Sequence, residues 1–318
     1  LIIRRFGVQV PVGPQMSSHS YIQNKKNKDI FININGELFH RSEAKVSVFD
    51  SGFLLGDGVW EGIRLHQSTL MFINEHLDRL FKSAAGISLD ISLSKKSIIK
   101  EIRKVLTKNN MIDDVHIRLI ISRGDKITPY QNPNANIGPI NFVIIPEYKK
   151  TDPRTYKDGI VIGRVPIIRP SDDILSTHYN TLSKLNCILA SIEANKLGFD
   201  EGIMNDPNGN ISTCNSTNLF FIKNEQVITS TGKYCLNGIT RGKAIEICNS
   251  NNIPCLEKNF TYDDIKDCHE AFVTGTFAGI IPVSKIEQRN LNSTNSDSLV
   301  NKIRLLYNKH IQENIISK

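Results

Sequence analysis

The order of apolar and polar positions in the first half of the chain predicts a mixture of strands and helices. Residues 30–40 alternate between the two kinds of side chain around Asn35-Gly36, the strongest short signal for a β-hairpin. Asn74 and Ser94 each precede a stretch with apolar residues three and four positions apart, which is typical of a capped amphipathic helix. Two further strands are predicted, at residues 116–122 and 141–146.

Short strands dominate the pattern from Gly159 onward, and three helices interrupt them. The sequence Asp206-Pro207-Asn208-Gly209 separates two of the strands as a hairpin turn would. Helices are predicted over residues 182–197 and 240–250. A last amphipathic helix is predicted from its apolar positions, which are Val300, Ile303, Leu306, Tyr307 and Ile311.

These elements together predict an α+β protein of two domains. A chain of 318 residues is long enough for two hydrophobic cores. The polar stretch around Pro153 is typical of a linker, and a cleft between two domains commonly binds a ligand. We predict an N-terminal extension over residues 1–29 that can be disordered, a small α+β domain over 30–147, a linker over 148–157 and a larger β-rich domain over 158–318.

Composition and charge argue against several classes of function. Hydrophobic residues make up 40% of the chain and charged residues 22%, as in an ordinary globular protein. The net charge of +7 is spread over scattered lysines, so an anionic substrate is favoured while nucleic-acid binding is not predicted. No apolar stretch approaches membrane-spanning length, and the first residues make a poor secretory leader. We therefore expect a cytoplasmic protein.

The six cysteines do not suggest chemistry of their own. None forms a Cys-x-x-Cys pair or lies with histidine at the spacing of metal ligands. We expect most of them to be buried small apolar residues in a reducing compartment. No metal site is predicted.

Three short motifs are suited to holding a phosphate group. Gly238-Ile239-Thr240 leads into a predicted helix, where free backbone N–H groups and the positive end of the helix dipole favour an anion. Gly275-Thr276 forms a second small turn after a predicted strand, and Arg79 could add a charge-assisted hydrogen bond. Each motif alone also has an ordinary explanation, because such a turn is more often a simple helix start and a helical arginine is more often a surface cation.

Taken in order, these motifs resemble those of the class IV pyridoxal-phosphate enzymes, the family of branched-chain and D-amino acid aminotransferases and aminodeoxychorismate lyase. The resemblance includes Glu75-His76-Leu77-Asp78-Arg79 and the block from Phe49 to Arg64, and it spans roughly residues 30–310. It implies a two-domain fold type IV architecture with pyridoxal 5'-phosphate in the larger domain, and a homodimer. The cofactor-binding residues that it implies are Arg79, Thr213, Asn218, Gly238, Ile239, Thr240, Gly275 and Thr276.

Two positions at the reactive end of the cofactor depart from the family's pattern. Counting back thirteen residues from Glu193 places Asn180 where the resemblance implies the catalytic Schiff-base lysine, and an amide cannot form an imine. Lys184 follows four residues later, one helical turn away, or about 5–6 Å if this segment is helical. Thr213 stands where the family has a glutamate beside the ring nitrogen, and a neutral hydroxyl cannot stabilise a protonated ring as a carboxylate does.

Three interpretations of the lysine position stay open. Lys184 can be a displaced Schiff-base lysine, or the catalytic lysine can be missing. The third interpretation is that the alignment to the family between Asn180 and Glu193 is locally out of register. For the substrate, the resemblance implies that Arg118 lies on the substrate side of the cleft. Either Arg118 or Arg123, which follows it along the chain, could pair with a substrate carboxylate, and Phe53 could form an apolar wall.

The predicted function is that of an aminotransferase that moves an amino group between an amino acid, branched-chain-like or D, and a 2-oxo acid. One alternative is a lyase that resembles aminodeoxychorismate lyase and eliminates pyruvate. The other alternative is a non-catalytic protein of the same fold that binds a phosphorylated ligand, because Asn180 and Thr213 replace the catalytic lysine and glutamate.

Overall fold

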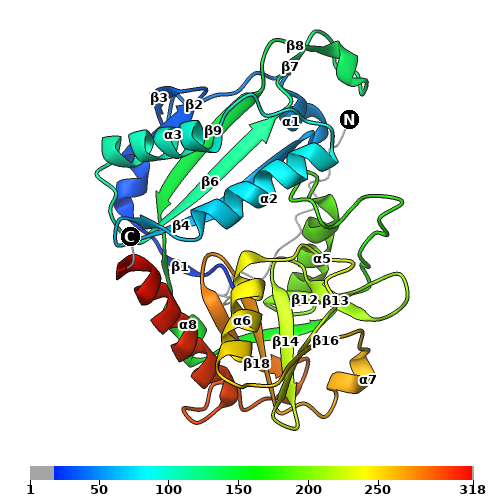
Figure 1. Cartoon of the computed structure of the whole chain (residues 1–318). Helices are drawn as coiled ribbons and strands as arrows, with labels where there is room; N and C mark the ends of the chain where they lie inside the picture. The colour runs from blue at the N-terminus through cyan, green and yellow to red at the C-terminus, as the bar shows by residue number, and fades with distance from the viewer. Residues whose placement is uncertain (1–17, 317–318) are drawn as a thin grey trace, which may run out of the picture.

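The computed structural model describes residues 18–316 and is built around two large β-sheets, one above the other in Figure 1. The start of the predicted extension, residues 1–17, lies outside the described residues. The expectation of disorder is wrong for the rest of it. Strand β1 (Tyr21–Ile22) pairs with β10 (Lys150–Thr151), and a 3-10 helix, η1 (Lys25–Asp29), follows.

The first sheet is antiparallel throughout and has the strand order β3-β2-β9-β6-β4-β5. Asn35 and Gly36 join β2 to β3 with φ angles of 53° and 90°, which confirms the predicted hairpin and suits a type I′ turn. Its strands are β2 (Phe31–Ile34), β3 (Glu37–His40), β4 (Gly58–His66), β5 (Thr69–Leu70), β6 (Val115–Ser122) and β9 (Asn141–Tyr148).

Helices α2 (Ile73–Gly86) and α3 (Lys95–Lys108) lie side by side on one face of this sheet (Figure 1). Ser94 caps α3 as predicted, because its side chain accepts a hydrogen bond from the Ser97 N–H. The predicted cap of α2 is wrong by two residues, since Phe72 and not Asn74 occupies that position. The apolar faces of both helices meet the sheet in one core that includes Leu77, Leu80, Ile98 and Ile102.

The second sheet has nine strands in the order β13-β12-β11-β18-β17-β14-β15-β16, with β19 paired to β18. It mixes parallel and antiparallel pairs; β11, for example, runs parallel to both β12 and β18. Its strands are β11 (Ile160–Arg164), β12 (Glu201–Asn205), β13 (Ile211–Cys214), β14 (Asn218–Lys223), β15 (Gln226–Thr229), β16 (Cys255–Glu257), β17 (Glu270–Gly275), β18 (Gly279–Ile286) and β19 (Arg289–Asn290).

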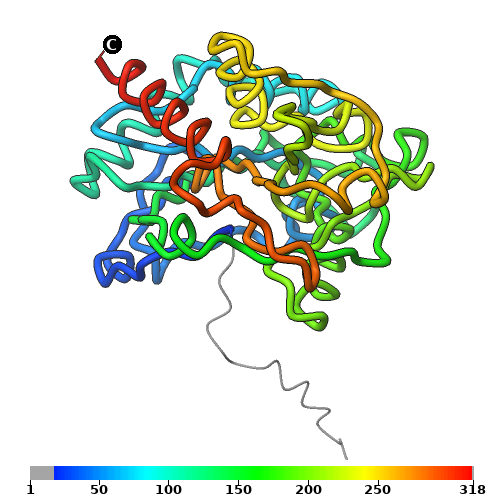
Figure 2. The backbone as a smooth tube through the Cα atoms, turned by 90° about the horizontal axis from the view of Figure 1, so that it is seen from below, coloured from blue at the N-terminus to red at the C-terminus, as the bar shows by residue number. Residues whose placement is uncertain are grey.

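Three longer helices pack around the second sheet. Helix α6 (Ile239–Ser250) shares a core with α8 (Leu299–Ile316), which lies near it in Figure 1, and α5 (Leu185–Lys196) packs on β12. Figure 2 shows α8 as the red helix along the edge of the molecule. Helix α5 begins at Leu185, three residues later than predicted. The shorter elements are α1 (Ser51–Leu55), β7 (Asp125–Lys126), η2 (Pro133–Ala135), β8 (Asn136–Ile137), α4 (Arg154–Lys157) and α7 (Tyr262–Ile265).

The expected linker at residues 148–157 is not an unstructured connection. It contains β10 and α4, and its Asp152 N–H donates to the Ser20 carbonyl. A second connection runs through residues 180–182, whose backbone pairs with the start of β4. The Leu182 N–H donates to the Gly58 carbonyl at 2.9 Å, and the Trp60 N–H donates to the Asn180 carbonyl at 3.0 Å. The segment before α5 is therefore fastened to the first sheet by backbone hydrogen bonds.

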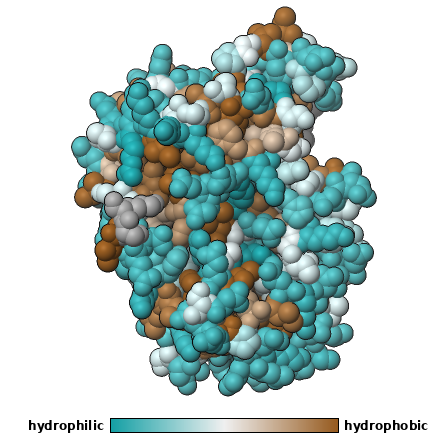
Figure 3. Space-filling model, viewed as in Figure 1, coloured by the Kyte–Doolittle hydropathy of each residue, from teal (hydrophilic) through white to brown (hydrophobic). Residues whose placement is uncertain are grey.

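Polar side chains cover much of the face shown in Figure 3, with apolar groups between them. An apolar group lies at the top of the view in Figure 3, and in the β7–β8 segment Ile127 and Ile137 are 69% and 51% exposed. Among residues 18–316, no helix combines the length and the apolar character that crossing a bilayer requires.

We predict that Leu80→Ala destabilises the first core. The Leu80 side chain is fully buried beneath α2, so its truncation should lower the free energy of unfolding by about 2–5 kcal/mol. Urea denaturation followed by circular dichroism measures this change. Leu305→Ala is the matched control, because that leucine is 55% exposed on α8. Equal effects of the two substitutions would contradict the assignment of Leu80 to the core.

Candidate active site

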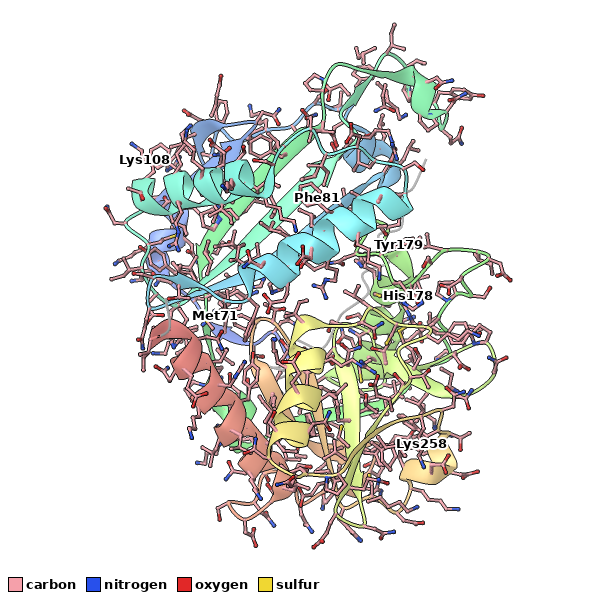
Figure 4. The ribbon with its side chains drawn as sticks, in the orientation of Figure 1. Met71, Phe81, Lys108, His178, Tyr179 and Lys258 are labelled. Atoms are coloured by element: carbon pink, nitrogen blue, oxygen red, sulfur yellow. The ribbon has the colours of Figure 1, made fainter. Side chains whose placement is uncertain are left out.

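A cavity of ≈ 400 Å³ lies where the two sheets meet, and side chains from both line it. From the first sheet come Trp60 and Arg118, and from the second comes Thr274. Figure 4 shows Tyr179, another lining residue, beneath the C-terminal end of α2. The sequence predicted a ligand-binding cleft between two domains, and this cavity lies between the two sheets. Several predicted site residues share it, namely Arg79, Arg118, Asn180, Lys184, Thr213, Asn218, Gly238, Gly275 and Thr276.

The three motifs that the sequence predicts to bind phosphate meet at one end of this cavity. Gly238 is the N-cap of α6 and has no side-chain capping bond, so the N–H groups of the first turn remain available for an anion. Gly275 and Thr276 line the same space, and the Thr274 hydroxyl is buried there without a hydrogen-bond partner. Ile239 and Thr240 do not line the cavity through their side chains. Thr240 is buried in the first turn of α6.

Arg79 reaches the phosphate-binding end from α2 and is held there by a buried carboxylate. Its Nε and Nη2 donate to the two Glu61 carboxylate oxygens, each at 2.8 Å, and its Nη1 donates to the Asn237 carbonyl at 3.1 Å. These bonds use three of the five guanidinium donors, so two stay available for a ligand.

Glu61 is fully buried in β4, and His76 contacts the same carboxylate at 2.7 Å. Burial alone would raise the pKa of Glu61, but Arg79 and His76 outweigh it and hold the pKa below its ordinary value. Glu61 is therefore ionised and fixes the direction of Arg79.

Asn218 shapes the turn that precedes α6. Its amide nitrogen donates to the Leu236 carbonyl at 3.0 Å. A Cβ atom at Gly238 would lie 2.5 Å from the Asn218 side-chain oxygen, so any larger residue there would displace the Asn218 amide. Asn218 therefore positions the backbone of the turn.

Asn180 lies in the cavity wall, at the position implied for the catalytic lysine. Its side-chain nitrogen donates to the Trp60 carbonyl at 2.8 Å, and its backbone N–H donates to the Ser83 hydroxyl at 3.0 Å. The residue is only 1% exposed, and its side-chain oxygen has no hydrogen-bond partner. The amide is therefore fixed in place with a free acceptor beside the cavity.

Lys184 also lines the cavity, but it does not share a helical face with Asn180. Residues 180–183 are not helical, and Lys184 is the N-cap of α5, so the one-turn geometry assumed from the sequence is wrong. Its Nζ lies 5.5 Å from the centre of the Trp60 ring. Burial lowers the pKa of the Lys184 amine to about 8; Cys187 opposes this shift, and nearby Arg169 and Arg79 add to it.

Thr213 supplies no acid to the cavity, and neither does its neighbour Glu201. The Thr213 hydroxyl donates to the Thr217 carbonyl at 2.7 Å, so only its lone pairs remain for a ligand. Glu201 is buried on β12 and accepts hydrogen bonds from the Ser18, Ser216 and Thr217 hydroxyls. Glu201 itself does not line the cavity, and its carboxylate oxygens are engaged by these hydroxyls.

Two predicted substrate contacts lie elsewhere. The Arg123 guanidinium pairs with both Asp57 carboxylate oxygens at 2.7 and 3.0 Å and donates to the Ile87 and Ser88 carbonyls. Its donors are used within the first domain, so it cannot serve a substrate in this cavity. Phe53 is 68% exposed on α1 and forms no wall of the cavity.

Sequence reasoning missed three cationic or titratable residues that line the cavity. Lys149 was assigned to a linker, although it directly follows β9. His116 precedes Arg118 by two positions on β6, a spacing that places both side chains on one face and could have identified it. Arg169 donates to the Asn186 side-chain oxygen at 2.8 Å and had no recognisable motif.

His66, Asp113 and Asp114 bring potential metal-ligand atoms within 4.8 Å of one another, away from the cavity. Asp114 is already paired with Arg64 at 3.1 Å and with Lys150 at 3.6 Å. These cations compete with a metal ion for the same oxygens, so we assign no metal to the cluster.

The residues present fit pyridoxal phosphate better at one end of the cavity than at the other. The uncapped start of α6, the unpartnered Thr274 hydroxyl and the two remaining donors of Arg79 suit a phosphate. Elsewhere in the lining, Lys184 offers an amine, and Thr213 offers a hydroxyl where an acid was expected.

Comparisons with known proteins agree with this arrangement. A family model described as amino-transferase class IV matches residues 58–286. A branched-chain-amino-acid aminotransferase-like protein from Arabidopsis thaliana is 34% identical over 89% of this chain, and the chain spans about half of that relative's length, 51%. A putative branched-chain-amino-acid aminotransferase from Methanocaldococcus jannaschii is 34% identical over 86% of this chain and 93% of its own.

The solved structures confirm the fold. The branched-chain amino acid aminotransferase of Escherichia coli superposes with a TM-score of 0.80 at 26% identity, over 87% of this chain and 93% of its own. The predicted α+β fold is therefore correct.

We predict that Glu61→Gln destabilises the protein at neutral pH and less so in acid. The substitution leaves the Arg79 charge without its buried partner, which costs about 3–5 kcal/mol. Because folding lowers the pKa of Glu61, its stabilisation is complete above the unfolded pKa of about 4.3 and is lost as the pH falls through the folded value.

Urea unfolding of both proteins between pH 7 and pH 3 should therefore show two curves that converge in acid. Glu75→Gln on the same helix is the control, because Glu75 pairs with Lys243 at the surface. A constant difference at every pH would show that the Glu61 charge does not hold Arg79.

Proposed function

The chain belongs to the class IV aminotransferase family, and on that premise we propose that it is a pyridoxal-phosphate-dependent aminotransferase in which Lys184 replaces the missing Schiff-base lysine. The reaction moves an amino group between an amino acid and a 2-oxo acid. The observation that carries the proposal is the Lys184 amine, which lines the same cavity as the phosphate-binding motifs.

The surroundings of Lys184 favour a nucleophilic amine. No hydrogen bond or ion pair engages its Nζ among the residues that the structure describes, so it is free to react. Its lowered pKa of about 8 leaves roughly a tenth of the amines neutral at pH 7, and only the neutral form is nucleophilic. A solvated lysine with an ordinary pKa would be almost entirely protonated.

Each remaining part of the cavity has a role in this proposal. The cofactor, when bound, supplies an electrophilic carbon and an electron-accepting ring. Arg79 and the start of α6 at Gly238 hold its phosphate. Trp60 limits access of water on the Lys184 side, and the Lys184 Nζ takes up and returns the substrate proton. Thr213 can only accept a hydrogen bond, so the ring is a weaker electron sink than one paired with a carboxylate.

A non-catalytic function is the second candidate, and the replaced positions favour it. Asn180 is tightly hydrogen-bonded and cannot react, and no carboxylate lines the cavity among the described residues. In that case the protein binds a phosphorylated ligand without amine chemistry.

Borohydride trapping decides between the two functions. The protein saturated with pyridoxal phosphate is reduced, digested and analysed by mass spectrometry, and we expect a pyridoxyl group on Lys184. Trapping should rise with pH through about 8, because the amine must lose its proton. Lys184→Met should abolish the adduct, while Lys196→Met on the same helix, whose lysine is exposed and paired with Glu193, should not.

An adduct on no lysine would overturn the aminotransferase proposal in favour of phosphorylated-ligand binding. Asn180→Lys in the Lys184→Met background then tests whether the cavity still accepts a lysine at the family's position. Where the adduct is found, a product that forms only with an added 2-oxo acid identifies amino transfer. Pyruvate release without an acceptor would identify the lyase instead.

We also propose that two copies of the chain form a homodimer through an apolar surface on α5 and α1. The Ser183 hydroxyl donates to the Gly56 carbonyl at 3.3 Å, so the end of α1 adjoins the start of α5, on one side of Figure 1. Large apolar side chains are exposed along both helices, and a patch of this kind is typical of a protein interface. They are Phe53, Leu55, Leu185, Ile188, Leu189 and Ile192.

We predict that Ile192→Asp weakens the dimer at least about tenfold, because it places a charge in the apolar surface. Ile192 is 43% exposed, so the folded monomer should tolerate the substitution. Sedimentation equilibrium measures the dissociation constant. Leu305→Asp on α8 is the control. A wild-type protein that is monomeric at micromolar concentration would contradict the proposal.

A further inference from the structure

A short N-terminal arm, residues Ser18–Ile22, reaches the cavity although it belongs to neither large sheet. Its strand β1 pairs with β10 in a separate sheet of two strands. Its first residue contacts the second large sheet instead, because the Ser18 hydroxyl donates to Glu201 of β12. His19 lies between these two attachments and lines the cavity. The arm is therefore fastened on both sides of the residue that it brings to the cavity.

Three polar groups form a hydrogen-bonded chain that ends at the His19 ring. The Ser18 hydroxyl donates its single proton to the Glu201 carboxylate, so its oxygen can only accept from His19 Nδ1, which lies 2.8 Å away. Nδ1 therefore carries a proton. In the neutral ring the other nitrogen, Nε2, is then the atom that accepts one.

Glu201 holds the start of this chain in one orientation. It is only 1% exposed, and the Ser216 and Thr217 hydroxyls donate to its two oxygens at 2.9 and 2.6 Å. Because these hydroxyls and that of Ser18 all donate to it, Glu201 acts as an acceptor only, as an ionised carboxylate does. Its negative charge therefore fixes the direction of the Ser18 hydroxyl and, through it, the tautomer of His19.

The electrostatic surroundings keep the His19 ring neutral at pH 7. Although the residue is exposed at the cavity wall, loss of water around the ring lowers the pKa of His19. Glu201 opposes this shift, and Lys149 and Arg118 add to it. His116 on β6 is a further titratable neighbour. The neutral ring is the form that can take up a proton.

The ring also borders the end of the cavity where the three predicted phosphate-binding motifs meet. It stacks on Phe277, with 6.2 Å between ring centres and 15° between ring planes. Phe277 is 6% exposed and directly follows Thr276 of the turn that the sequence predicts to bind phosphate. A ligand held by that turn therefore extends past His19 or lies next to it.

We propose that His19 is a second acid–base residue of the cavity, positioned by Ser18 and Glu201, so that the N-terminal arm completes the active site. The inference rests on the proposed aminotransferase function, in which Lys184 handles a different proton. An amino acid arrives with a protonated amine, which must lose a proton before its nitrogen can react.

In this step the proton passes from the substrate ammonium group to His19 Nε2, which leaves a neutral amine and an imidazolium ring. Nδ1–H stays bonded to Ser18, and the Glu201 charge stabilises the imidazolium through the Ser18 hydroxyl. The proton returns to solvent or to the product amine when the product leaves.

The tautomer of His19 is the first test, and it needs no bound ligand. Nitrogen NMR of the full chain with labelled histidines should show the His19 proton on Nδ1 at pH 8. Ser18→Ala should leave both tautomers populated, because Nδ1–H loses its acceptor. Ser216→Ala is the matched control, since that hydroxyl also donates to Glu201 without contacting the ring. A wild-type ring with its proton on Nε2 would overturn the proposal.

The pH dependence of the reaction is the second test, with His19→Gln as the variant. Glutamine can still donate to Ser18 but cannot take up a proton. The protein saturated with pyridoxal phosphate is mixed with L-leucine or D-alanine, and the rate of the change in cofactor absorbance is measured. We expect a loss of at least about a hundredfold at pH 7. The loss should shrink to less than about tenfold at pH 9.5, because the amine loses its proton to solvent there.

His269→Gln is the matched control, because that histidine is exposed just before β17. A loss in His19→Gln that is equal at both pH values would show that the residue is only structural, and no loss would show that it has no role. Either result, with the adduct on Lys184 present, rejects His19 and retains the aminotransferase. An absent adduct and no absorbance change with either amino acid reject the aminotransferase and this role together.

Discussion

The cavity depends on a short stretch of backbone pairing between β4 and residues 180–182. This pairing fastens the segment before α5 to the first sheet, with hydrogen bonds of 2.9 and 3.0 Å at Leu182 and Trp60. It places Trp60 and Asn180 in one wall, and it sets Lys184 at the start of α5. Trp60 and Asn180 both lie on hydrogen-bonded backbone, so their positions in the cavity wall are fixed by the fold.

The cations around the cavity differ in whether a carboxylate neutralises them. Arg79 has a buried carboxylate partner that orients it before any ligand arrives, as preorganised binding requires. Lys184, Arg118 and Lys149 are half-buried without such a partner. An uncompensated charge of this kind lowers stability, and a chain retains it where a ligand supplies the counter-charge. Arg79 thus has its counter-charge within the fold, whereas the other three cations have no ion-pair partner among the described residues.

Sequence patterns correctly predicted the elements that depend on only a few neighbouring residues. The Asn35-Gly36 hairpin and the Ser94 cap were correct because turn geometry and capping need only a few neighbouring residues. The start of α5 was wrong because its apolar pattern continues into a segment that pairs with β4 instead. Arg123 was misjudged for a similar reason, since Asp57 and two distant carbonyls engage it across the fold.

The sequence by itself determined the family and the α+β architecture, and it predicted the motifs of the phosphate-binding end. Each of these signals is carried by contiguous residues in a fixed order. The resemblance also predicted that Asn180 and Thr213 depart from the family's pattern. Only the tertiary structure decided that Lys184 shares the cavity and that Lys149 and His116 belong to it. The reason is that burial, lowered pKa values and missing counter-charges arise from residues distant in the chain, which folding alone brings together.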